Sequence, residues 1–129
     1  MARILVIDDE VHIRQVVSLK LSSAGHEVIQ ASNGADGQET ALVHKPDLII
    51  TDYQMPRMNG LEMCRALRQH ADIGPIPVIL LSGREQFIAP AEMAAVGIVT
   101  SLGKPFSPRE LLQKVTEVLD SASRARRAG

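Results

Sequence analysis

The sequence contains very few aromatic residues: among 129 residues there are no tryptophans, one tyrosine and two phenylalanines. Without aromatic platforms, a site that stacks nucleic-acid bases or sugar rings is not expected. The single cysteine, Cys64, excludes an internal disulfide and suits a reducing compartment. No apolar run approaches the roughly 20 residues that span a bilayer, and acids occur too early for a signal peptide. We therefore expect a cytoplasmic protein.

Charge and length predict one ordinary globular domain. The 14 lysines and arginines nearly balance the 15 aspartates and glutamates, and the net charge of −1 argues against a general nucleic-acid binder. A chain of 129 residues predicts a single domain, with 45% hydrophobic residues for an aliphatic core. We expect the folded domain to cover residues 1–122 and the basic segment 123–129 to be a disordered tail.

An apolar run without alternation, Leu48-Ile49-Ile50, leads through Thr51 into Asp52. Such a run is typical of a strand buried on both faces of a parallel sheet. Similar runs predict further strands, and helical spacing with capping residues predicts a helix after each strand. The expected strands cover residues 4–7, 26–31, 48–52, 76–81 and 98–102, and the expected helices cover 11–24, 35–44, 60–69, 90–96 and 108–121.

Strict alternation of strands and helices predicts an α/β fold with a five-stranded parallel sheet. Right-handed crossovers place helices on both faces, and we expect the flavodoxin-like strand order 2-1-3-4-5. The first and third strands are then neighbours, so their carboxyl ends bring Asp8 and Asp9 beside Asp52. The fourth strand adds Ser82, and the loop after the fifth strand adds Lys104.

Carboxylates gathered at one edge of a sheet repel one another, so either their pKa values rise or a cation enters. An all-oxygen site without histidine or cysteine suits Mg²⁺ rather than zinc. Lys104 offers an ammonium, and Ser82 a hydroxyl, to anionic oxygens. This combination favours phosphoryl transfer with Asp52 as the nucleophile, which would give an aspartyl phosphate.

Four sequence marks follow one another along the chain: Asp8-Asp9-Glu10, the stretch from Asp52 to Gly60, Ser82-Gly83 and Lys104-Pro105-Phe106. With these marks, residues 3–122 resemble the receiver domain of a two-component response regulator, similar to the single-domain chemotaxis type. The resemblance implies that Asp9 and Asp52 bind Mg²⁺ directly, together with the backbone carbonyl of Gln54, and that Asp8 helps through water. It also implies a cis peptide bond before Pro105.

The resemblance further implies that Asp52 accepts a phosphoryl group from a phosphohistidine on a histidine kinase or a histidine phosphotransfer protein. Lys104 and Ser82 would contact the phosphoryl oxygens. The chain would catalyse its own phosphorylation and dephosphorylation without being a metabolic enzyme, and an output protein would read the change. We expect no direct binding to DNA or membranes, and a monomer or weak homodimer.

One alternative stays open, a receiver-like scaffold that binds partners without phosphorylation. It rests on Ser101, because the position three before the lysine is usually aromatic in this family. Two other classes do not fit the sequence. Dehalogenase-like phosphotransferases need two aspartates spaced one residue apart, whereas Asp8 and Asp9 are adjacent. A nucleotide-binding module needs a glycine-rich loop where this chain has acids.

Overall fold

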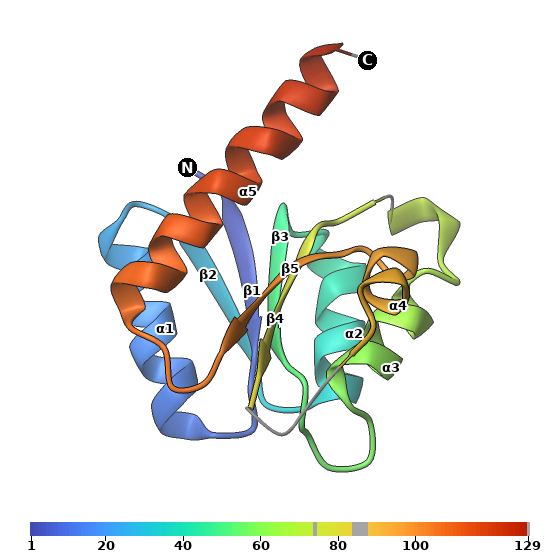
Figure 1. Cartoon of the computed structure of the whole chain (residues 1–129), viewed down its shortest axis with the longest axis horizontal. Helices are drawn as coiled ribbons and strands as arrows, with labels where there is room; N and C mark the ends of the chain where they lie inside the picture. The colour runs from blue at the N-terminus through green and yellow to red at the C-terminus, as the bar shows by residue number, and fades with distance from the viewer. Residues whose placement is uncertain (74, 84–87, 129) are drawn as a thin grey trace.

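The structure is a computed structural model that describes residues 1–73, 75–83 and 88–128. Strands and helices alternate along the chain, as the sequence predicts (Figure 1). The strands are β1 (Arg3–Ile7), β2 (Glu27–Ala31), β3 (Leu48–Asp52), β4 (Val78–Ser82) and β5 (Ile98–Gly103). The helices are α1 (Val11–Ser23), α2 (Gly34–His44), α3 (Gly60–Leu67), α4 (Pro90–Ala95) and α5 (Pro108–Ala128), with a 3₁₀ turn at Ala71–Ile73.

The five strands form one parallel sheet in the order β2-β1-β3-β4-β5. The predicted fold class and strand order are therefore confirmed. The register pairs Ile7 of β1 with Thr51 of β3, and Asp52 at the end of β3 with Leu81 of β4. The carboxyl ends of the central strands thus share one edge of the sheet, which lies at the bottom of Figure 1.

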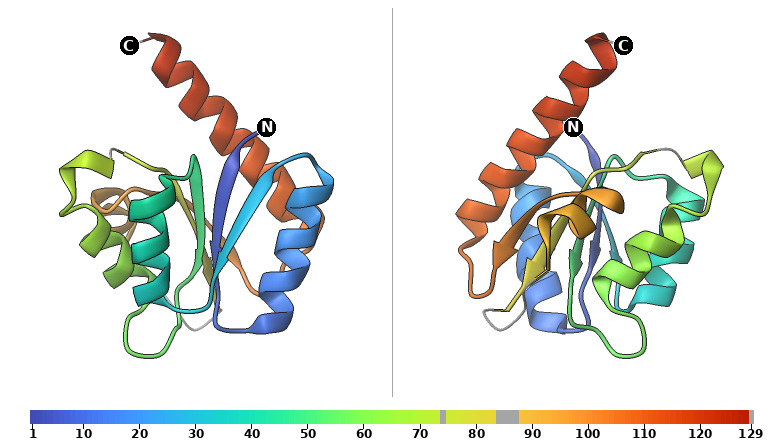
Figure 2. Two further views of the ribbon diagram at one scale, coloured as in Figure 1. Left: turned by 180° about the vertical axis from the view of Figure 1, so that it is seen from behind. Right: turned by 45° about the vertical axis from the view of Figure 1, so that its right-hand side comes forward.

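Helices cover both faces of the sheet, with α1 and α5 on one face and α2 and α3 on the other (Figures 1 and 2). Successive residues of a central strand enter separate cores. On β1, Ile4 packs in the core that contains Val17 of α1 and Leu111 of α5. The next residue, Leu5, packs in the core that contains Met63 of α3. Because both faces are buried, the central strands are apolar without alternation.

The loop after β3 returns closely to the end of that strand. The side chain of Asn59 accepts the backbone N–H of Glu62, and the Glu62 carboxylate accepts the N–H of Asn59, so the two residues form a capping box at the start of α3. Gly60 donates its N–H to the carbonyl of Tyr53 at 2.8 Å. A Cβ on Gly60 would lie 2.5 Å from the backbone oxygen of Asp52, so glycine is required for this approach.

The last helix is longer than the sequence analysis predicts. α5 continues to Ala128, so the expected helix end near Ser121 is wrong, and residues 123–128 are helical. These residues are alanines, arginines and a serine without an internal glycine or proline, so local helix propensity carries the helix onward. Its end projects beyond the sheet (Figure 1). The domain boundary at residue 122 stays a prediction. Neither α5 nor any other helix in the described ranges is long and apolar enough to cross a membrane.

Candidate functional site

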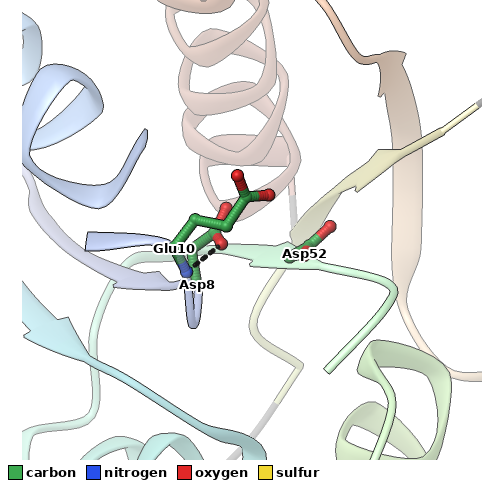
Figure 3. Close-up of side chains that lie close together, drawn as sticks. All are labelled: Asp8, Glu10 and Asp52. Atoms are coloured by element: carbon green, nitrogen blue, oxygen red, sulfur yellow. Dashed lines mark hydrogen bonds between the residues drawn. The ribbon is translucent and has the colours of Figure 1, made fainter. Parts of the chain in front are cut away.

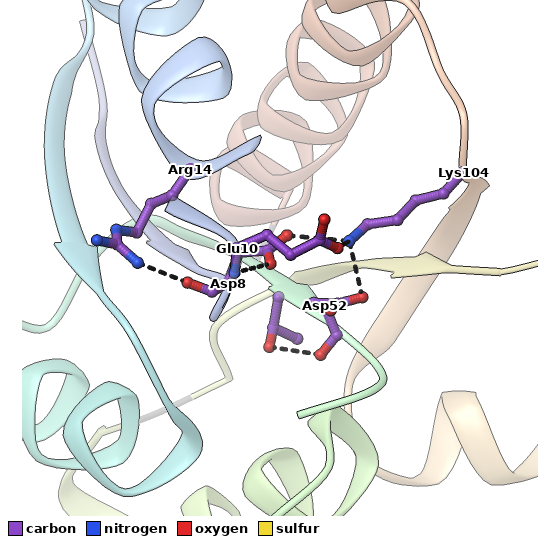
Figure 4. Close-up of polar contacts among 6 residues, drawn as sticks. Asp8, Glu10, Arg14, Asp52 and Lys104 are labelled. Carbon is purple, nitrogen blue, oxygen red and sulfur yellow. Dashed lines mark hydrogen bonds and ion pairs between the residues drawn. The ribbon is translucent and has the colours of Figure 1, made fainter. Parts of the chain in front are cut away.

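Three charged side chains from distant parts of the chain meet at the carboxyl edge of the sheet (Figure 4). Asp8 follows β1, Asp52 ends β3, and Lys104 follows β5. The Lys104 Nζ atom lies 3.2 Å from Oδ2 of Asp8 and 3.3 Å from Oδ1 of Asp52. Asp8 is 0% exposed and Asp52 is 4% exposed. Two buried carboxylates thus share one ammonium, which is the partner that burial of their charge requires.

A third carboxylate, from Glu10, completes the cluster (Figure 3). Its Oε1 atom lies 3.1 Å from Nζ of Lys104, and its side chain is 61% exposed. Sequence reasoning did not place Glu10 among the site residues. The available signal was its position directly after the two aspartates. An exposed acid at the start of a helix, however, is already explained by its favourable interaction with the positive end of the helix dipole. Its contact with Lys104 depends on side-chain directions that a motif does not specify.

The remaining predicted site residues surround this cluster. Asp9 is exposed, and its charge is one of the influences that raise the pKa of Asp52. Gln54 lies exposed two residues after Asp52. Ser82 is half-buried at the end of β4, opposite Gly103 in the register, and its backbone oxygen accepts the N–H of Lys104 at 2.7 Å. Their expected roles toward Mg²⁺ and phosphate stay predictions.

The loop after β1 is held in place by backbone and side-chain hydrogen bonds. The Asp8 N–H donates to the carbonyl of Ala31 at 3.2 Å. The Oδ1 atom of Asp8 accepts the N–H of Glu10 at 2.9 Å, which leaves Oδ2 facing Lys104. Arg14 donates from Nη1 to the Asp8 carbonyl at 2.7 Å and from Nε to the side chain of Gln30 at 3.1 Å. The Asp8 carboxylate is therefore oriented from several sides.

Burial dominates the protonation chemistry of the two aspartates. It raises the pKa of Asp52 to about 6, with a further rise from the charge of Asp8, against the lowering effect of Lys104. Burial also raises the pKa of Asp8, while hydrogen bonding from the Glu10 backbone and the charge of Lys104 oppose the rise. A cation bound beside these two carboxylates would stabilise their ionised forms and so offset the cost of burying their charge.

Lys104 is placed by the loop that leaves β5. Its backbone N–H donates to the carbonyl oxygen of Ser82, and its peptide bond to Pro105 is cis, as the resemblance implies. Burial lowers the pKa of Lys104, but the charges of Asp52 and Asp8 outweigh this effect, so its pKa is raised. The side chain therefore stays an ammonium near neutral pH.

The donor atoms of the cluster fit a hard divalent cation. Carboxylate oxygens of Asp8, Glu10 and Asp52 all lie within 4.8 Å of one another. These oxygens are the ligand type that Mg²⁺ prefers, and the three negative charges face a single ammonium. The cluster can hold Mg²⁺, with Glu10 as a carboxylate in reach that the predicted ligand set does not contain.

The chain is similar in sequence to a known protein family and to known proteins. Residues 4–116 match the family model described as "Response regulator receiver domain". The chain is 34% identical over 116 residues to the phosphate regulon transcriptional regulatory protein PhoB of Pseudomonas aeruginosa, covering 90% of this chain and 51% of that protein. It is 36% identical over 124 residues to the DNA-binding dual master transcriptional regulator RpaA of Synechocystis, covering 96% and 52%. The chain therefore spans about half the length of these curated relatives.

Two solved structures match this chain over nearly their whole length. The chemotaxis response regulator CheY4 of Vibrio cholerae has a TM-score of 0.83 and 36% identity, covering 92% of this chain and 98% of that one. The receiver domain of the Francisella response regulator 1452 has a TM-score of 0.83 and 28% identity, covering 95% and 99%. The chain belongs to the response regulator receiver domain family, the phosphorylation-controlled modules of two-component signalling systems.

Proposed function

We propose that Asp52 accepts a phosphoryl group from the phosphohistidine of a histidine kinase or a histidine phosphotransfer protein, in a reaction that depends on Mg²⁺. One observation carries the proposal: the nearly buried carboxylate of Asp52 lies 3.3 Å from the Lys104 ammonium, at the carboxyl edge of the sheet. Ligand sites of open α/β sheets form at this edge. Membership in the receiver family supports the same assignment.

The nucleophile is the ionised carboxylate of Asp52. With a pKa of about 6, most Asp52 side chains are ionised at neutral pH. One carboxylate oxygen attacks the phosphorus, the P–N bond breaks with its electron pair going to the imidazole nitrogen, and an aspartyl phosphate forms. Hydrolysis of that acyl phosphate at the same site resets the chain.

Two side chains are proposed to receive the phosphoryl oxygens. The Lys104 ammonium already faces Asp52, and the Ser82 hydroxyl stands at the end of the neighbouring strand. The proposed holders of Mg²⁺ are Asp8, Asp9, Asp52 and the backbone carbonyl of Gln54. When bound, Mg²⁺ supplies positive charge against the phosphoryl oxygens.

Output passes to a protein partner under this proposal. The PhoB and RpaA relatives are named as transcriptional regulators, but this chain has a net charge of −1, which supports neither direct DNA binding nor attraction to an anionic membrane. We propose a cytoplasmic monomer or weak homodimer. The alternative, a scaffold that works without phosphorylation, is favoured by Ser101, which is exposed on β5 at the usually aromatic position.

Intact-protein mass spectrometry tests the proposal. The wild-type chain is incubated with acetyl phosphate, and separately with phosphoramidate as a P–N donor, with and without Mg²⁺. Asp52→Asn removes the nucleophile at nearly constant shape, and Asp120→Asn alters an exposed acid of α5 as a matched control. We expect one phosphate adduct on wild type and Asp120→Asn with Mg²⁺, and none on Asp52→Asn.

An adduct that persists on Asp52→Asn, or no adduct from either donor, would contradict the proposed function. The scaffold alternative makes a separate prediction about partners. If a binding partner captured by the wild-type chain binds Asp52→Asn equally well in the presence of a phosphodonor, partner binding is independent of the phosphate and the scaffold is favoured.

A further inference from the structure

The Lys104 ammonium faces three carboxylates in this structure. Its Nζ atom lies 3.2 Å from Asp8, 3.1 Å from Glu10 and 3.3 Å from Asp52. An ammonium has three N–H donors and accepts nothing. Figure 4 shows Glu10 and Asp52 approaching Nζ from different sides. An oxygen of a phosphoryl group on Asp52 would therefore meet an ammonium that also faces the carboxylates of Asp8 and Glu10.

Glu10 differs from the other two carboxylates in how firmly it is held. Asp8 is buried, and its other oxygen accepts the N–H of Glu10. Asp52 would itself carry the phosphoryl group. The Glu10 side chain is 61% exposed, and although Glu10 is the N-cap residue of α1, its side chain makes no capping hydrogen bond. Glu10 is therefore the carboxylate that can leave Lys104 for water at the lowest cost.

Electrostatic repulsion also favours the departure of Glu10 from Lys104 when Asp52 is phosphorylated. A phosphoryl group brings nearly two negative charges and strong acceptor oxygens to Asp52. The Glu10 carboxylate lies within 4.8 Å of the Asp52 carboxylate, so the two anions would repel each other while competing for one ammonium. The contact between Glu10 and Lys104 thus belongs to the unphosphorylated chain.

We propose that Glu10 competes with the phosphoryl group for Lys104 and thereby restrains phosphorylation of the chain. This inference rests on the proposed phosphorylation of Asp52. Glu10 is a positioning residue, because it acts on the reaction through Lys104. A contact present only in the unphosphorylated state lowers the free energy of that state and shifts the balance away from the phosphorylated one.

Two substitutions separate the contact from the charge. Glu10→Asp keeps the negative charge but is one methylene shorter, so its carboxylate withdraws from Lys104. Glu10→Ala removes both contact and charge. Glu39→Ala removes an exposed acid of α2 and serves as the matched control for net charge. Because Glu10 makes no side-chain capping bond, neither substitution deletes a support of α1.

The first readout is the rate of adduct formation with acetyl phosphate, at Mg²⁺ concentrations that saturate each variant. Exposed ion pairs of this kind are weak, so we expect Glu10→Asp and Glu10→Ala to react about two- to fivefold faster than wild type. Glu39→Ala should react at the wild-type rate. Equal rates for Glu10→Asp and wild type, with only Glu10→Ala faster, would mean that charge repulsion acts on the donor and would overturn the proposal.

The second readout uses the metal-free, unphosphorylated chain and does not depend on activity. Proton exchange of the Lys104 ammonium is followed by nitrogen-15 NMR, with the signal assigned by its loss in Lys104→Arg. We expect faster exchange in Glu10→Asp and Glu10→Ala than in wild type and Glu39→Ala. Unchanged exchange in both Glu10 variants would refute the contact itself. Absence of any adduct on wild type would instead count against the proposed function.

Discussion

Arg14 donates a hydrogen bond of 2.7 Å to the main-chain carbonyl of Asp8, while Lys104 approaches the carboxylate of the same residue. Figure 4 shows the two cations on opposite sides of Asp8. The guanidinium of Arg14 also donates to Gln30 at the end of β2, so one side chain ties the carboxyl ends of β1 and β2 together. Arg14 thereby fixes the loop from which the acidic cluster is built.

Arg14→Lys should weaken Mg²⁺ binding. Lysine keeps the charge, but its single ammonium cannot reproduce the planar fork that bonds Asp8 and Gln30 together. Because groups that orient metal ligands are worth about tenfold or more in affinity, we expect a loss of that size. The fluorescence of Tyr53, the one tyrosine in a chain without tryptophan, follows the titration beside Asp52. Arg65→Lys, on the exposed side of α3, is the control, and equal affinities for both variants would contradict this role.

Asp52→Asn should stabilise the metal-free chain near neutral pH. The folded-state pKa of Asp52, about 6, lies above the ordinary value of 3.8, so the folded state binds the proton more tightly than the unfolded state. The contribution of this carboxyl group to the free energy of unfolding is fully present below about pH 4 and is lost as the pH rises to about 6. The loss amounts to about 3 kcal/mol at most, and the asparagine variant does not suffer it.

Urea unfolding in the presence of a chelator measures this effect. The free energies of unfolding of wild type and Asp52→Asn should converge near the acidic end and separate by about 1–3 kcal/mol above pH 6, with the variant more stable. A wild-type chain that gains stability relative to the variant between these limits would show that the pKa of Asp52 is lowered in the folded state. Added Mg²⁺ should reduce the difference, because it relieves the repulsion among the carboxylates.

Gly60→Ala should destabilise the chain and slow phosphorylation together. Its Cβ would lie 2.5 Å from the backbone oxygen of Asp52 and 3.1 Å from the Leu80 side chain. Overpacking of this kind costs about 1–3 kcal/mol, and relief requires the end of β3 to move. Gly103→Ala is the control, since its Cβ would meet nothing within 4 Å and should change stability by less than about 0.5 kcal/mol. Equal unfolding midpoints for the two variants would refute the steric argument.

Removal of residues 123–129 should leave the domain intact. Arg124 and Ala125 are exposed, so their loss should change the free energy of unfolding by less than about 0.5 kcal/mol. Removal of residues 116–129 also deletes Val118 and Leu119, which pack against the core of the α1–α5 face, and should cost about 2 kcal/mol or more. Chemical unfolding of both truncated chains decides the boundary. A large loss in the shorter deletion would move the boundary beyond residue 122.

The strand order and the meeting of Asp8, Asp52 and Lys104 were predictable because topology determines both. Apolar runs without alternation identify buried parallel strands, and the carboxyl ends of neighbouring strands share an edge. Ile4 and Leu5 enter opposite cores, which is the physical origin of the run. The capping box at Asn59 was predictable for a similar reason, since it depends only on residues three apart.

Two features of the structure were not predicted from the sequence. The contact of Glu10 with Lys104 depends on the reach of an exposed side chain, which spacing does not encode. The length of α5 was underestimated because its apolar periodicity stops at Leu119, while the helix propensity of the following alanines and arginines continues to Ala128. In this helix the apolar pattern therefore ends several residues before the helix itself does.

Under the proposed function, Asp52 itself becomes the phosphorylated residue. The most direct measurement is peptide mass spectrometry after reaction with acetyl phosphate and Mg²⁺, followed by borohydride reduction, which converts an aspartyl phosphate into homoserine. We expect homoserine at residue 52, dependent on both Mg²⁺ and the donor. Reduction at Asp8 or Asp9 instead, or an unmodified residue 52 in a chain that carries the phosphate adduct, would contradict it.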